Sequence, residues 1–179
     1  MVAGRELGYW ESFCHVLHKD YFLSSMAQTV VLARGPLRDS VLKSALRQLQ
    51  ERHPLLRARI VEPRDRERHF RFHVSPEAGD LPLVVQEPGS ASTWRTIAEN
   101  EFHIDFDARY ACHWRVSFLP ATEVEGPHAL IMMFHHALAD GICMVAFVQE
   151  LLNLCSALAR DRCPEVRRLP LLEPFRGVA

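Results

Sequence analysis

The apolar residues of this chain recur with two periods, one typical of helices and one typical of strands. Residues 37–52 form the clearest predicted helix, because apolar side chains return every three or four positions and charged side chains fall between them. Pro54 ends this helix, since the residue before a proline avoids the α region. Weaker helical patterns cover residues 6–17, 93–102 and 142–158, the last with an apolar stripe through Val145, Val148 and Leu152.

Strand patterns lie between these helices. Residues 129–134 are a continuous apolar run, which is typical of a central strand buried on both faces. Residues 112–119 alternate, with Trp114, Val116 and Phe118 on one face, and therefore predict a half-buried strand. Further strands are predicted at residues 22–33, 56–62, 69–74 and 83–86, the second and third of these as a hairpin. The pattern indicates an α/β fold with a mixed β-sheet flanked by helices.

Composition narrows the functional classes. The chain has 179 residues, 48% hydrophobic and 24% charged, which suits one globular domain or one lobe of a larger one. A net charge of −1 gives no indication of a nucleic-acid partner or an anionic membrane. The sequence shows neither a secretory leader nor an obvious membrane-spanning segment, so we expect no membrane span and a cytoplasmic location. The five cysteines form no CxxC pair, so neither a zinc site nor a disulfide framework is indicated.

Candidate chemistry is concentrated in the segment HHALADG at residues 135–141, which follows the predicted central strand and precedes a helix. A strand end would carry His136 to the lip of the sheet, where an imidazole can take a proton from a hydroxyl or an amine. Asp140 could fold back or pair with an arginine to fix the turn, and Gly141 would give backbone freedom where the helix starts. His135 and His136 point to opposite faces of a strand, so the pair cannot bind one metal ion.

A plainer interpretation of the same segment remains open. The two histidines could complete the strand and satisfy local hydrogen bonds without any catalytic role. The arginines of the helix end, Arg52 and Arg57, could likewise be ordinary solvated charges.

The segment at residues 135–141 resembles the HHxxxDG signature of the chloramphenicol acetyltransferase-like superfamily, which includes nonribosomal peptide condensation domains and several acyltransferases. Residues 52–57, RHPLLR, are similar to the RHxxLR element of condensation domains, and the likeness extends over about residues 5–160. The resemblance implies a chloramphenicol acetyltransferase-like lobe with His136 as general base and with His135, Asp140 and Gly141 as structural residues. It also implies that Arg57, or else Arg52, pairs with Asp140.

Within the superfamily, residues 24–26 and 35–60 look most like polyketide-associated and alcohol O-acyltransferases, while Cys143 stands where many condensation domains have serine. The resemblance therefore implies transfer of an acyl group from an acyl-CoA or an acyl-phosphopantetheine carrier protein to a hydroxyl or an amine. It implies no bound cofactor and no metal. Three other functions stay open: a lobe of an amide-forming condensation domain, a lobe of an epimerisation domain, and a docking lobe without activity.

Members of the superfamily with both motifs at these positions are about twice as long and contain two similar lobes. We therefore expect residues 1–160 to be an N-terminal lobe. Residues 161–179, with three prolines, would be an inter-lobe linker or surface arm. The expected partners are the thioester donor and a second lobe, and the isolated chain is expected to be incomplete as an enzyme.

Overall fold

The computed structural model describes residues 3–21, 25–63, 69–87, 93–106, 112–123, 126–162 and 164–174. Its centre is a four-stranded mixed sheet in the order β2-β7-β6-β5, in which β5 runs parallel to β6 and the other neighbours are antiparallel. The strands are β2 (Met26–Ala33), β5 (Leu83–Val85), β6 (Trp114–Leu119) and β7 (His128–His135). The predicted α/β class with a mixed sheet is confirmed.

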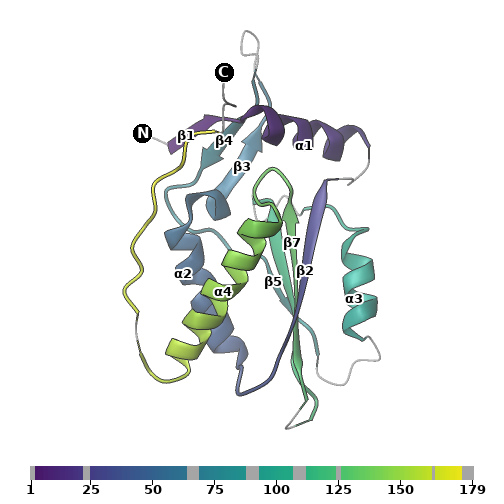
Figure 1. The fold of residues 1–179 in the computed structure, drawn as a ribbon, viewed down its shortest axis with the longest axis vertical. Coiled ribbons are helices and arrows are strands. Elements are labelled where there is room, and N and C mark those ends of the chain that lie inside the picture. Colours follow the sequence, from purple (N-terminus) through teal and green to yellow (C-terminus); the bar gives the residue numbers. More distant parts are fainter. Residues whose placement is uncertain are drawn as a thin grey trace.

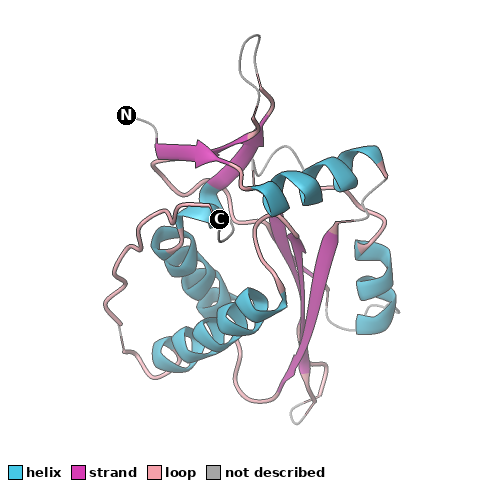
Figure 2. Ribbon diagram, turned by 45° about the horizontal axis from the view of Figure 1, so that its top comes forward, coloured by secondary structure: helices cyan, strands magenta, loops and turns pink. Residues whose placement is uncertain are grey.

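Helices cover both faces of this sheet. In Figures 1 and 2 two helices lie side by side on one face, and a third lies on the other. The pair consists of α2 (Asp39–Arg52) and α4 (Gly141–Leu158), and the third helix is α3 (Trp94–Glu101). The apolar stripe of α2 is buried as predicted, because it packs with α4 and the sheet in the main hydrophobic core.

Strand β7 occupies the centre of the sheet, between β2 and β6. Its residues from Ala129 to His135 are all buried, as the continuous apolar run predicted. In β6 the predicted inner face is confirmed, since Trp114, Val116 and Phe118 are each at most 1% exposed. The expected half-buried strand is wrong, because Ser117 on the other face is buried against Glu101 of α3. The strand that carries the HHxxxDG segment is therefore the most constrained strand of the lobe.

A second sheet of three antiparallel strands lies beside the first, in the order β1-β4-β3. It contains β1 (Ala3–Glu6), β3 (Ala58–Val61) and β4 (Arg71–Val74), and a 3₁₀ turn at Pro54–Arg57 leads into β3. The β3–β4 hairpin was predicted, and its connection at residues 64–68 lies outside the described residues. Strand β1 was not predicted, and the first helix, α1 (Tyr9–Asp20), begins and ends three residues later than expected.

Helix α4 differs from its prediction in two ways. Its buried stripe runs through Met144, Phe147, Leu151 and Leu154, whereas Val145 of the predicted stripe is 57% exposed. The helix is also apolar on its outer side. By length and composition alone it could cross a membrane, with a mean hydropathy of 1.6 over 18 residues, and the expectation of no membrane span stays a prediction.

The segment after α4 packs against the lobe as an extended strap, drawn in yellow in Figure 1. The backbone N–H of Leu169 donates to the carbonyl of Arg52 at 2.9 Å, and Leu171 packs against the core of the second sheet. Cys163 and residues 175–179 lie outside the described residues. The strap is therefore anchored between Val166 and Leu171, and the proposed boundary between lobe and linker near residue 160 stays a prediction.

Candidate active site

The end of β7 positions the two adjacent histidines. The backbone N–H of His135 donates to the carbonyl of His113, which directly precedes β6, at 2.9 Å. The backbone N–H of His136 donates to the carbonyl of Ser25, also at 2.9 Å. His135 is the last residue of β7, and His136 is the first residue of the turn that follows it. The two imidazoles therefore enter different surroundings.

His135 enters a packed interior and has no exposed surface. Its Nδ1 accepts a hydrogen bond from the backbone N–H of Ala137 at 3.0 Å. An accepting Nδ1 carries no proton, so in the neutral ring the proton sits on Nε2. This bond ties the ring to the turn that follows β7 and so fixes the path of the chain toward α4.

Three more imidazoles surround His135. The ring centroids of His18, His113 and His15 lie 4.6, 5.3 and 5.6 Å from that of His135. Burial, followed by the neighbouring imidazoles, lowers the pKa of His113 to about 4. The same causes lower the pKa of His135 far below its ordinary value. The four rings form a packed cluster in which burial disfavours the charged forms of His135 and His113.

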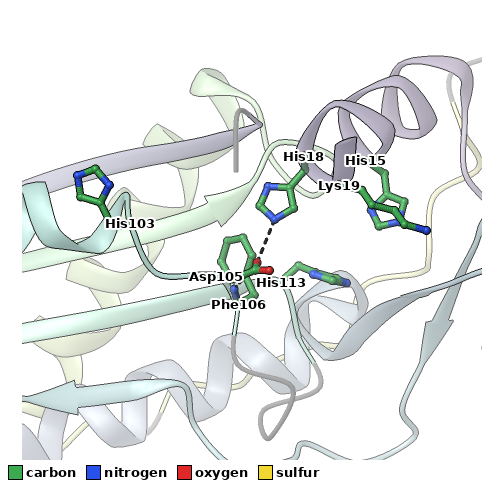
Figure 3. A pocket seen from close by; sticks show the side chains of 7 residues that line it. All are labelled: His15, His18, Lys19, His103, Asp105, Phe106 and His113. Atoms are coloured by element: carbon green, nitrogen blue, oxygen red, sulfur yellow. Dashed lines mark hydrogen bonds and ion pairs between the residues drawn. The ribbon is translucent and has the colours of Figure 1, made fainter. Parts of the chain in front are cut away.

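A cavity of about 420 Å³ opens beside this cluster, and Figure 3 shows the side chains that line it. The Nε2 of His18 lies 3.0 Å from an Asp105 carboxylate oxygen, while His103 stands apart from the other rings. His113 Nε2 accepts from the N–H of Ile60 at 3.1 Å, which leaves the proton on its Nδ1. Within the described part of the chain, no three His, Cys, Asp or Glu side chains are arranged to hold a metal ion.

His136 faces the opposite side, where a second cavity of about 280 Å³ opens. The ring of Trp10, from α1, meets the imidazole edge-on with centroids 6.3 Å apart. His136 Nδ1 is buried without a hydrogen-bond partner among the described residues, so Nε2 is the nitrogen that a substrate can reach. The cavity is lined by Gly8, Trp10, Glu11, His136, Ala137, Leu138, Ala139, Asp140 and Cys143.

Asp140 is an exposed helix cap rather than a member of a buried ion pair. Its side chain accepts a hydrogen bond from the backbone N–H of Cys143 at 2.8 Å, which makes it the N-cap of α4. This bond is the main cause that lowers the pKa of the Asp140 carboxyl. Among the described residues no cation pairs with this carboxylate, so the implied pairing with Arg57 or Arg52 is wrong.

Both arginines of the RHPLLR element are used elsewhere. Arg57 donates to the carbonyls of Gln50, of Glu51 at 3.0 Å and of Ser75 at 3.1 Å, and so joins the end of α2 to the end of β4. Arg52 forms an ion pair with Glu150 of α4 at 2.5 Å and donates to the carbonyl of Arg167 in the strap at 2.8 Å. The element is therefore a brace between helices, hairpin and strap.

Gly141 is the first residue of α4. Its φ is not positive, and a Cβ built there would meet no described atom within 4 Å. The backbone freedom expected of this glycine is therefore not required by the lobe itself.

The sequence patterns assigned no role to Trp10 and did not predict the histidine cluster. The available signals were weak. The chain carries Trp10 in an aromatic-rich first helix, and the alternation of 112–119 places His113 on the face opposite Trp114. Neither pattern shows that these side chains contact the end of β7. Trp10 lies more than a hundred residues before that strand end in the sequence.

Comparisons with known proteins agree with this fold. The sequence profile of the condensation domain family matches residues 17–171. Cyclosporin synthetase of Tolypocladium inflatum is 34% identical over 143 residues, which is 79% of this chain, and a nonribosomal peptide synthetase of Alternaria alternata is 27% identical over 168 residues, which is 92% of it.

Two solved structures share the fold at low identity. The starter condensation domain of rhizomide synthetase matches with a TM-score of 0.74 at 15% identity over 90% of this chain, and the X-domain from teicoplanin biosynthesis with 0.72 at 24% over 95%. This chain spans 40% and 36% of those structures. It spans only 1% and 3% of the two synthetases.

Proposed function

The chain belongs to the condensation domain family, and on that premise we propose that it supplies the general base of an amide-forming site in a nonribosomal peptide synthetase. One observation carries the proposal. His136 stands at the end of a rigid central strand, with Nε2 facing a cavity large enough for reacting groups. The substrates are an acyl group and an amine acceptor, each held as a thioester on a carrier protein.

The reaction needs one proton to move. The acceptor amine attacks the donor thioester carbonyl, its nitrogen–carbon bond forms, and His136 Nε2 takes the proton that the nitrogen loses. The tetrahedral oxyanion then collapses, the carbon–sulfur bond breaks, and the proton passes to the leaving thiolate. The products are an amide and a free thiol, with no covalent acyl-enzyme.

The relatives support amide formation more than the O-acyl transfer that was the main expectation from the sequence. The Alternaria relative is a nonribosomal peptide synthetase by name, and the family profile is that of the condensation domain. A carrier-bound thioester donor is consistent with the same relatives. An acyl-CoA donor and an alcohol acceptor are left as alternatives for the experiment to separate.

Reconstitution of the complete condensation domain that contains this chain tests the proposal. The domain is mixed with a donor carrier protein and an acceptor carrier protein, each loaded with an aminoacyl group. We expect the acceptor carrier to gain the donor acyl group through an amide, visible by mass spectrometry, with stoichiometric release of donor thiol.

Each alternative has its own readout in the same assay. Ester formation from an acyl-CoA and an alcohol, without amide formation, would make the domain an O-acyltransferase. Uptake of solvent deuterium at the donor Cα without an acceptor would make it an epimerisation domain. Carrier binding without turnover of any substrate would leave a docking lobe. Any of these three results contradicts the proposed amide synthesis.

We also propose that a second lobe closes the cavity over His136. The neighbouring start of α4 presents Ile142 at 82% exposure and Val145 at 57%, an apolar surface suited to a covering partner. Positioning and exclusion of water supply a large part of such rate enhancements. Residues 1–179 alone should therefore release no thiol in the assay above, while addition of the second half should restore turnover.

A further inference from the structure

Trp10 is a large aromatic side chain that remains 57% exposed beside His136. Its ring lies edge-on to the His136 imidazole, with centroids 6.3 Å apart, and lines the same cavity. A second aromatic side chain, Phe13, lies on the next turn of α1, with its ring centroid 5.5 Å from that of Trp10. The indole therefore lies next to the His136 imidazole, while more than half of the Trp10 surface stays exposed.

The first turn of α1 holds Trp10 rigidly. Glu11 accepts a hydrogen bond from the backbone N–H of Gly8 at 2.6 Å, which caps the helix. The same carboxylate forms a two-point contact with Arg5 of β1, at 2.6 and 2.7 Å, and the Arg5 guanidinium lies over the Phe72 ring of β4. The wall that carries Trp10 is therefore fastened to the second sheet, and the indole is placed by a braced element rather than a loose loop.

The charge of the cavity determines which kind of substrate group would bind beside Trp10. Two carboxylates, those of Glu11 and Asp140, line it, and no lysine or arginine does so among the described residues. Arg5 compensates the charge of Glu11, whereas Asp140 caps α4 through Cys143 and pairs with no lysine or arginine in the described part of the chain. A cation that enters the cavity therefore finds an unpaired carboxylate and the face of an indole, which both attract positive charge.

We propose that Trp10 is a positioning residue for the acceptor amine, which arrives as an ammonium group between the indole face and Asp140; this inference rests on the function proposed above. The donor carries a neutral thioester at its reacting end, so the charged amine is the group that this pair can recognise. The ammonium loses one proton to solvent before attack. The remaining amine then lies beside His136 Nε2, which takes the second proton as the amide bond forms.

Steady-state kinetics of the complete domain provide the first test. Trp10→Ala should raise the KM for the aminoacyl acceptor about 10-fold, within the range of a partly desolvated cation–π contact, and should leave the donor KM unchanged. Trp10→Phe should retain most of the effect because it keeps an aromatic face. Tyr9→Ala is the matched control, since Tyr9 neighbours Trp10 on the helix, is 86% exposed and does not line the cavity. A change in donor KM alone, or no change in either KM, would overturn the proposal.

Equilibrium binding gives a second test that needs no turnover. The probes are the N-acetylcysteamine thioester of phenylalanine and that of its hydroxy analogue, phenyllactic acid, which differ only in amine against hydroxyl. The wild-type domain should bind the amine several-fold more tightly, and Trp10→Ala should remove that preference while the melting temperature stays constant. Equal binding of both probes to the wild type would refute the role of Trp10 even in a domain that makes amides. Failure of amide synthesis with an intact, Trp10-dependent preference would refute only the proposed reaction.

Discussion

His135 and His136 are neighbours in the chain, yet they occupy opposite kinds of environment. His135 has no exposed surface, is tied to the backbone of Ala137 and touches three other imidazoles. His136 faces an open cavity with Trp10 and has an accessible nitrogen. His135 is the last residue of the buried strand β7, whereas His136 begins the turn that leads from it toward α4, and this change of backbone separates the two side chains.

The two environments suit His135 to a structural role and His136 to a chemical one. A base must reach its substrate and exchange a proton with it, which only the His136 side allows. Burial makes the charged form of His135 costly, so that ring suits a fixed hydrogen-bond role instead. The pair therefore divides into a residue that shapes the turn and a residue that can react at its surface. Substitutions on the two sides should then affect different measurements.

The largest effect is expected on the buried side. His135→Ala removes a fully buried ring and leaves the N–H of Ala137 without its acceptor, so the free energy of unfolding should fall by about 3–5 kcal/mol. His135→Asn is the control, because its Oδ1 can accept the same bond, and it should lose less. Urea unfolding of the complete domain measures both. A His135→Ala protein as stable as the parent would show that the cluster contributes little to the fold.

Substitution of His136, on the exposed side, should affect turnover rather than stability. His136→Ala should lower kcat for amide formation about 100-fold, which corresponds to about 2.7 kcal/mol in the barrier, because the general base is lost. The melting temperature should change little, since only the cavity wall loses atoms. Kinetics and thermal melts on the same preparation check the contrast. Undiminished turnover would remove His136 from the chemistry and leave both histidines as structural residues.

The sequence predicted this strand end because two independent patterns meet there. The apolar run of β7 and the HHxxxDG segment are both local, so neither depends on distant contacts. Helix α2 was predictable for the same reason, since its single apolar stripe gives one clear inward face. The Leu37–Arg52 prediction differs from the observed start at Asp39 by two residues, which is ordinary fraying of a boundary.

Features that depend on tertiary contacts were not predictable. Strand β1 has only four residues and no strand pattern, and it exists because it pairs with β4. Helix α4 is apolar on two sides, so periodicity could not tell which side faces the core. The role of Arg57 was also misjudged, because nearby carbonyls at the end of α2 satisfy its guanidinium before the distant Asp140 can.

Acid should lower the free energy of unfolding through the buried histidines. The pKa of His113 is lowered to about 4, while an unfolded histidine titrates near 6.5. Below pH 6.5 the unfolded chain therefore binds more protons than the folded one, and stability falls as the pH drops toward 4. Each such histidine contributes a slope of up to about 1.4 kcal/mol per pH unit.

Unfolding curves between pH 7 and pH 4 measure this slope, with His135→Asn as the matched variant that removes one titrating ring. The variant should show a shallower dependence, because the pKa of His135 is also lowered by burial. Asp105 faces the cluster beside His18, and its carboxylate raises the pKa of His113, so it offsets part of the effect. Equal slopes for the two proteins would place the acid sensitivity outside the cluster.

The smallest effect concerns Asp140, on the exposed side. As an N-cap that accepts from the backbone N–H of Cys143, it can be replaced by asparagine, which accepts the same bond. Asp140→Asn should therefore change the free energy of unfolding by less than about 0.5 kcal/mol, whereas Asp140→Ala should cost about 1 kcal/mol. A buried ion pair with an arginine would behave differently, because Asp140→Asn would then strand a charge and cost about 3–5 kcal/mol. Urea unfolding of both variants in the complete domain separates the two cases, and a cost of that size for Asp140→Asn would mean that a cation from outside the described residues reaches this carboxylate.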